Sequence, residues 1–110
     1  MLASQLVMMR DDEGKTPLFL AAEIGTEDTV RLLMRHNPME QVMVADNVGM
    51  IPLMIAAKNG HVNVMEVLLC HNLEEQIAYV IACGDTYRDL VKNVLYEKWL
   101  STDTIALSES

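Results

Sequence analysis

The sequence predicts an all-α fold: a solenoid of helix-turn-helix units with a 35-residue period that ends in a C-terminal capping helix. Residues 14–25 align with residues 49–60 at an offset of 35, and six of the aligned positions are identical. Hydrophobic residues make up 51% of the chain and aromatic residues only 5%, which favours closely stacked aliphatic helices. A length of 110 residues fits one domain and excludes a second independent one.

Each unit begins with a turn and a short first helix. Gly14 follows acidic residues, a composition typical of a turn in which glycine supplies a positive φ. Thr16 and Pro17 have the order of an N-cap and a first helical residue, so we expect a helix over about residues 17–23 that ends at Gly25. The equivalent positions of the second unit are Gly49, Ile51, Pro52 and Gly60.

A second helix is predicted in each unit, over about residues 26–35 and 62–70, because apolar residues recur there at helical spacing. Asn37 and Asn72 follow these helices. Asparagine tolerates the left-handed conformation of a helix C-cap second only to glycine, so we expect both residues to adopt it.

The third unit departs from this pattern. Residues 85–100 contain no Pro-Leu pair and no central glycine, so we expect one longer helix there. An apolar stripe opposes its charged residues, which suits the end of a stack because a terminal unit needs a polar outer surface. The stripe comprises Leu90, Val91, Val94, Leu95 and Trp99.

The whole chain, residues 1–110, is therefore predicted to be a single domain. When the 35-residue offset is applied toward the N-terminus, residues 1–13 align with the end of a repeat, so we expect them to be the tail of a preceding partial unit. We expect two full repeats, then a partial repeat or capping helix, then a polar tail that frays. These segments are residues 14–48, 49–83, 84–100 and 101–110, respectively.

Residues 11–72 resemble the ankyrin-repeat family. The resemblance rests on paired residues at the family's spacing, which in the first unit are Pro17-Leu18, Ala21-Ala22 and Leu32-Leu33, with Gly25 between the helices. Phe19 and Met54 replace the family's histidine. Ile51 replaces the threonine kept as Thr16, so we expect weaker hydrogen bonding at that helix start.

The 35-residue period exceeds the family's usual period of about 33. The extra residues fall within residues 38–45, where the family has an extended finger. This stretch could instead form an extra helical turn, and residues 73–80 have the same pattern.

Composition excludes several classes of function. Sixteen acidic and eight basic residues give a net charge of −8, which argues against binding to nucleic acid or to an anionic membrane. The longest apolar stretch, residues 50–57, is far shorter than the roughly 20 residues of a membrane-spanning helix, and residues 1–10 do not match a secretory signal. Two cysteines and nine methionines favour a reducing compartment, so we expect the cytoplasm or the nucleus.

No motif predicts catalysis, a cofactor or a metal site. Cys70, Cys83 and the histidines His36, His61 and His71 do not have the paired spacing of a zinc site, and His36 and His71 recur at the repeat offset. A thiol nucleophile lacks the cationic surroundings that lower a thiol pKa. A redox or metal switch at the two cysteines is kept as an alternative that oxidation or added zinc would test.

The resemblance instead implies a non-enzymatic protein-protein interaction module, or scaffold, that binds through its turn tips and the exposed side of its first helices. An acidic surface favours a partner with a basic one. We expect Met34, Met54 and Met65 to be core residues, and Met50 to be exposed to a partner. The expected binding residues are Asp12, Glu13, Lys15, Glu23, Ile24, Asn47, Val48, Met50, Lys58, Asn59 and Asp85.

A second function is also open. A stable stack normally needs at least about three repeats. The chain is therefore alternatively interpreted as a structural or capping segment of a longer repeat protein, with weak self-association through its surface.

Overall fold

Short helices follow one another along the chain, which the computed structural model describes over residues 2–94 and 96. Within this part every regular element is a helix, so the predicted all-α repeat fold is confirmed. None of these helices is both long and apolar enough to cross a bilayer. The helices are α1 (Leu2–Val7), α2 (Pro17–Ile24), α3 (Glu27–Leu33), α4 (Pro38–Gln41), α5 (Pro52–Lys58), α6 (Val62–Leu69) and α7 (Leu73–Ala82), and residues 85–94 are also helical.

Local capping residues set where the helices begin and end. The Thr16 hydroxyl accepts a hydrogen bond of 3.2 Å from the backbone N–H of Phe19, and Pro17 is the first residue of α2. Ile51, at the start of α5, makes no such bond, as predicted. Helix α3 is shorter than predicted because Thr26 is its N-cap and Met34 its C-cap.

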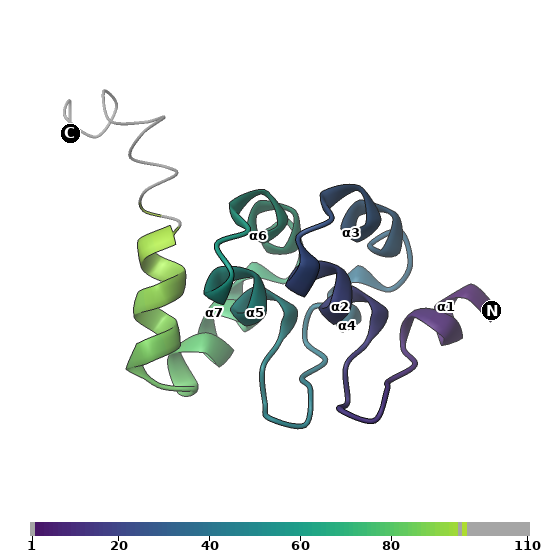
Figure 1. Cartoon of the computed structure of the whole chain (residues 1–110), viewed down its shortest axis with the longest axis horizontal. Helices are drawn as coiled ribbons and strands as arrows, with labels where there is room; N and C mark the ends of the chain where they lie inside the picture. Colours follow the sequence, from purple (N-terminus) through teal and green to yellow (C-terminus); the bar gives the residue numbers. More distant parts are fainter. Residues whose placement is uncertain (1, 95, 97–110) are drawn as a thin grey trace.

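Two layers of stacked helices contain the core. Helix α2 packs against α5, and α3 packs against α6, so that the molecule extends 49 Å along the stack (Figure 1). Small side chains at Ala22, Ala56 and Ala57 are fully or almost fully buried and let α2 and α5 approach closely. Leucine, isoleucine, valine and methionine fill the space between the layers, with Phe19 as the one buried phenylalanine.

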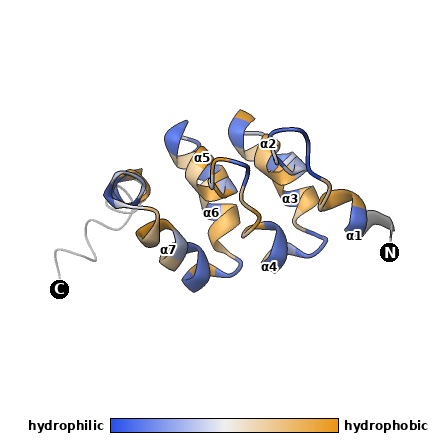
Figure 2. Ribbon diagram, turned by 90° about the horizontal axis from the view of Figure 1, so that it is seen from below, coloured by the Kyte–Doolittle hydropathy of each residue, from blue (hydrophilic) through white to orange (hydrophobic). Residues whose placement is uncertain are grey.

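A further row of helices follows each helix pair. Viewed from below, α1, α4 and α7 follow one another along one edge of the molecule (Figure 2). Helices α4 and α7 show that the extra residues form helical turns rather than an extended finger. Asn37 and Asn72 precede them with positive φ angles of 47° and 55°, which confirms their predicted left-handed conformation.

Two buried glutamines hold this row in place. The amide Nε2 of Gln41 donates to the carbonyls of Leu33 and His36, at 2.6 and 2.5 Å. Gln76, at the equivalent position, donates to Leu68 and His71, at 2.7 Å each. These carbonyls lie at and just after the C-terminal ends of α3 and α6, where helices leave acceptors without an intrahelical donor. One side chain per repeat therefore bonds to two carbonyls at a helix end: those of His36 and His71 have this donor alone among the described bonds, and those of Leu33 and Leu68 also accept from backbone N–H groups.

The third unit is partly described. Residues 85–94 form a helix, and its apolar stripe contacts the core through Leu90, Val91 and Val94. Leu95, Trp99 and the predicted tail 101–110 lie outside the described residues.

We predict that replacing Gln76 lowers stability because the change removes both hydrogen bonds donated by its amide Nε2 and leaves the His71 carbonyl without its described donor. Gln76→Met should reduce the free energy of unfolding by about 2 kcal/mol, and Gln76→Glu by more, because a carboxylate would face two carbonyl oxygens. Urea denaturation followed by circular dichroism measures both. The exposed Gln5 provides the control, and Gln5→Met should change stability by less than about 0.5 kcal/mol. A Gln76→Glu variant as stable as the wild type would contradict the assigned role.

Candidate protein-interaction surface

Each turn tip is closed by an aspartate. In the first tip, Asp11 Oδ1 accepts hydrogen bonds from the backbone N–H groups of Glu13, at 2.9 Å, and Lys15, at 2.8 Å. In the second, Asp46 Oδ1 accepts from Val48, at 3.1 Å, and Met50, at 2.8 Å. An aspartate that bonds to its own following backbone stabilises a tight turn. The tips are thus defined loops that present the residues between the bonds outward.

The two tips are joined to each other. The backbone N–H of Asn47 donates to the carbonyl of Glu13, at 2.9 Å, and its side-chain amide donates to the carbonyl of Asp12, at 3.0 Å. Arg10 spans the same junction, because its guanidinium donates to the carbonyls of Gly14 and Ala45, at 3.0 and 2.7 Å. Asp12, Glu13 and Asn47 are therefore brought together, as the predicted surface requires. The repeat pattern did not predict that Arg10 links the two tips.

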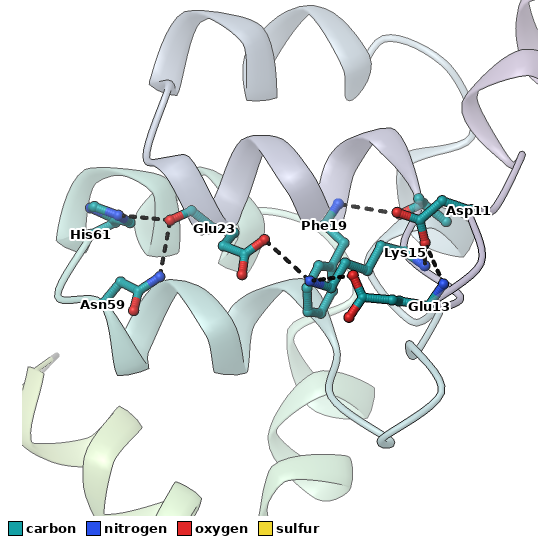
Figure 3. Close-up of polar contacts among 8 residues, drawn as sticks. Asp11, Glu13, Lys15, Phe19, Glu23, Asn59 and His61 are labelled. Carbon is teal, nitrogen blue, oxygen red and sulfur yellow. Dashed lines mark hydrogen bonds and ion pairs between the residues drawn. The ribbon is translucent and has the colours of Figure 1, made fainter.

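Lys15 connects the first tip to helix α2. Its ammonium lies 3.6 Å from a carboxylate oxygen of Glu13 and 3.6 Å from one of Glu23, and 5.6 Å from the ring centre of Phe19 (Figure 3). Desolvation lowers the pKa of Lys15, but the two carboxylates outweigh it and raise that pKa above its usual 10.5. Lys15 is thus a cation shared between two acids.

The C-terminal ends of α2 and α5 are also linked across the repeats. The Asn59 side-chain amide donates to the carbonyl of Glu23, at 3.0 Å, and His61 Nε2 lies 3.1 Å from the same oxygen (Figure 3). Because a carbonyl only accepts, Nε2 carries the proton. Ile24 and Lys58 remain exposed beside this junction. Of the predicted residues at this end, Glu23 and Asn59 therefore form the junction, and Ile24 and Lys58 are exposed to solvent.

Two predicted residues stand apart. The expected exposure of Met50 is wrong: the residue is only 8% exposed and belongs to the core. Two tyrosines from later in the chain lie against this tip: the Tyr87 hydroxyl is 3.7 Å from the Met50 sulfur, and Tyr79, on α7 within the second repeat, donates a 2.6 Å hydrogen bond to the carbonyl of Gly49. Asp85 is exposed and pairs with Arg88 at 3.3 Å, and no described contact joins it to the other predicted residues.

Val48 is the most exposed apolar residue among the large ones described, at 82%. It lies at the apex of the second tip, next to Asn47 and hence next to the acidic first tip. The surface therefore combines one apolar side chain with the carboxylates of Asp12 and Glu13. Among the described residues, no group of three histidine, cysteine or acidic side chains is arranged as metal ligands.

Comparison with known proteins matches this architecture. A family model described as ankyrin repeats, in three copies, matches residues 2–80. No curated protein matches the chain significantly.

The tie between Tyr79 and the second tip gives a stability prediction. Tyr79→Phe removes the hydrogen bond to Gly49 and should lower the free energy of unfolding by about 1 kcal/mol. Desolvation, with Cys83 and Asp46 nearby, raises the pKa of Tyr79 above its usual 10.0. The stabilisation should therefore be fully present below pH 10.0 and be lost as the pH rises through the higher pKa of the folded state. Denaturation at several pH values measures both effects. The exposed Tyr96 serves as control, because Tyr96→Phe should have almost no effect.

Proposed function

Because the chain belongs to the ankyrin-repeat family, whose members generally bind other proteins, we propose that its joined turn tips bind a partner protein. The observation that carries the proposal is the junction of the tips. Asn47 is bonded to the backbone of both Asp12 and Glu13, so Val48 is presented from a loop whose shape is fixed before binding. A surface ordered in advance loses less conformational entropy on association.

The chemistry of the tips favours a basic partner with an apolar contact residue. Asp12 and Glu13 are exposed, and Lys15 only partly offsets them because it is shared with Glu23. The net charge of −8 adds a long-range attraction for a cationic surface, which raises the association rate. Val48 would then insert into an apolar depression on the partner. Ile24, Lys58 and Asn59 extend the same face along α2 and α5.

We infer a binding role without catalysis, since ankyrin repeats are typically non-enzymatic. In this proposal residues 1–110 form one domain with full repeats at 14–48 and 49–83, and residues 84–100 cap the stack. The exposed free thiols of Cys70 and Cys83 support action in the cytoplasm or the nucleus, where thiols stay reduced.

The proposal predicts which substitutions weaken partner binding. The full chain is used to capture partners from a cell extract, and each captured protein is then purified and titrated against variants. Val48→Asp and the double variant Asp12→Lys/Glu13→Lys should each weaken binding at least about tenfold, because they remove the apolar contact and reverse the charge. All variants are first checked for an unchanged melting curve.

Met39→Asp is the matched control, because Met39 is an exposed apolar residue on α4, outside the tips. It should leave the affinity unchanged. Partners that bind both tip variants as tightly as the wild type would contradict the proposal.

A further inference from the structure

The repeat register reveals a stacking face that is exposed among the described residues. Leu20 is 38% exposed, whereas its equivalent in the second repeat, Ile55, is 6% exposed. Leu32 is 55% exposed and its equivalent, Val67, is 6% exposed. In the described residues the second repeat has the helix pair α2 and α3 on its N-terminal side, whereas the first repeat is preceded by the single helix α1 and its loop. Positions that become buried only when such a neighbour is present must face it.

A third position shows the same contrast. Thr29 on α3 is exposed, whereas its equivalent on α6, Val64, is buried. Leu20, Thr29 and Leu32 are therefore defined as the N-terminal face. In the second repeat the equivalent residues are covered by the helix pair α2 and α3. A surface of this kind thus fits the aliphatic side chains of another pair of helices.

The charges along α3 indicate which helix pair this is. The helix begins with Glu27 and Asp28 and has Arg31 in its last turn, and Arg35 follows in the turn after it. Glu27 and Arg31 pair with each other at 2.9 Å. Asp28 and Arg35 have no ion-pair partner among the described side chains. Asp28 lies one helical turn before Leu32, and Arg35 lies just beyond the C-terminal end of α3.

We propose that two copies of this chain associate through their N-terminal faces about a twofold axis, with their α3 helices antiparallel. This arrangement places Leu32 near the axis and brings Asp28 of each copy to Arg35 of the other. An isologous contact of this kind is self-complementary and closes at a dimer. The surface differs from the turn tips, so the proposal stands or falls independently of partner binding.

Association is expected to be weak, because the face is small and each copy carries a net charge of −8. Sedimentation equilibrium of the full chain, from about 10 μM to about 1 mM, covers the relevant range of dissociation constants. The weight-average mass of the wild type should rise with concentration from 12.3 kDa toward twice that value and stop there. A wild type that stays monomeric throughout overturns the proposal, and so does a mass that continues to rise beyond a dimer.

Leu32→Glu should raise the dissociation constant at least about tenfold, because it puts two carboxylates near the axis. Leu73→Glu is the matched control, since Leu73 is an exposed leucine on α7 in the second repeat, and it should leave dimerisation unchanged. Circular dichroism confirms that each variant is folded. Equal effects of the two substitutions, or none from Leu32→Glu, would place the contact elsewhere.

Charge reversal tests the antiparallel geometry. Asp28→Arg alone and Arg35→Asp alone each put like charges opposite one another and should weaken the dimer, whereas Asp28→Arg with Arg35→Asp should restore it. The double variant has the same net charge as the wild type, so general repulsion cannot account for the rescue. Absence of rescue in a folded double variant would rule out the antiparallel pairing.

Discussion

The close contact between α2 and α5 determines the rest of the structure. Buried alanines at Ala22, Ala56 and Ala57 leave no bulk between the two helices, so their backbones approach closely and the repeats share one core. At that separation the tips meet, and Asn47 reaches the first tip. At the opposite end Asn59 reaches the last turn of α2. Larger side chains at the alanine positions would separate both junctions at once.

The buried glutamines explain the departure from the usual repeat length. An extended finger would leave the carbonyls at the ends of α3 and α6 to bond elsewhere, whereas Gln41 and Gln76 reach back to them from an added helical turn. The 35-residue period is thus the length of a helix pair with its own C-terminal cap. The added helix α7 also supports the second tip, because Tyr79 donates to the carbonyl of Gly49.

Local signals predicted most of the fold, and long-range contacts account for what they missed. Thr16, Pro17 and Asn37 act through neighbouring residues, so their roles could be derived from the sequence. The burial of Met50 could not, because Tyr87, whose hydroxyl lies against its sulfur, belongs to the diverged segment after the second repeat, where the repeat pattern carries no information. The tips were predicted as a group of residues, but their rigidity depends on bonds between residues about 35 positions apart.

Three asparagine hydrogen bonds between the units share one property: Asn47, Asn59 and Asn72 each donate to a backbone carbonyl of the preceding unit. The side chains on the accepting residues, such as Asp12 and Glu23, are not part of these joints. Natural selection can therefore change the accepting residues to suit a new ligand without loosening the stack. On the proposed binding surface, the coupling of the repeats and the recognition of a partner thus depend on different atoms of the same residues, so a side chain can change while the backbone hydrogen bond is kept.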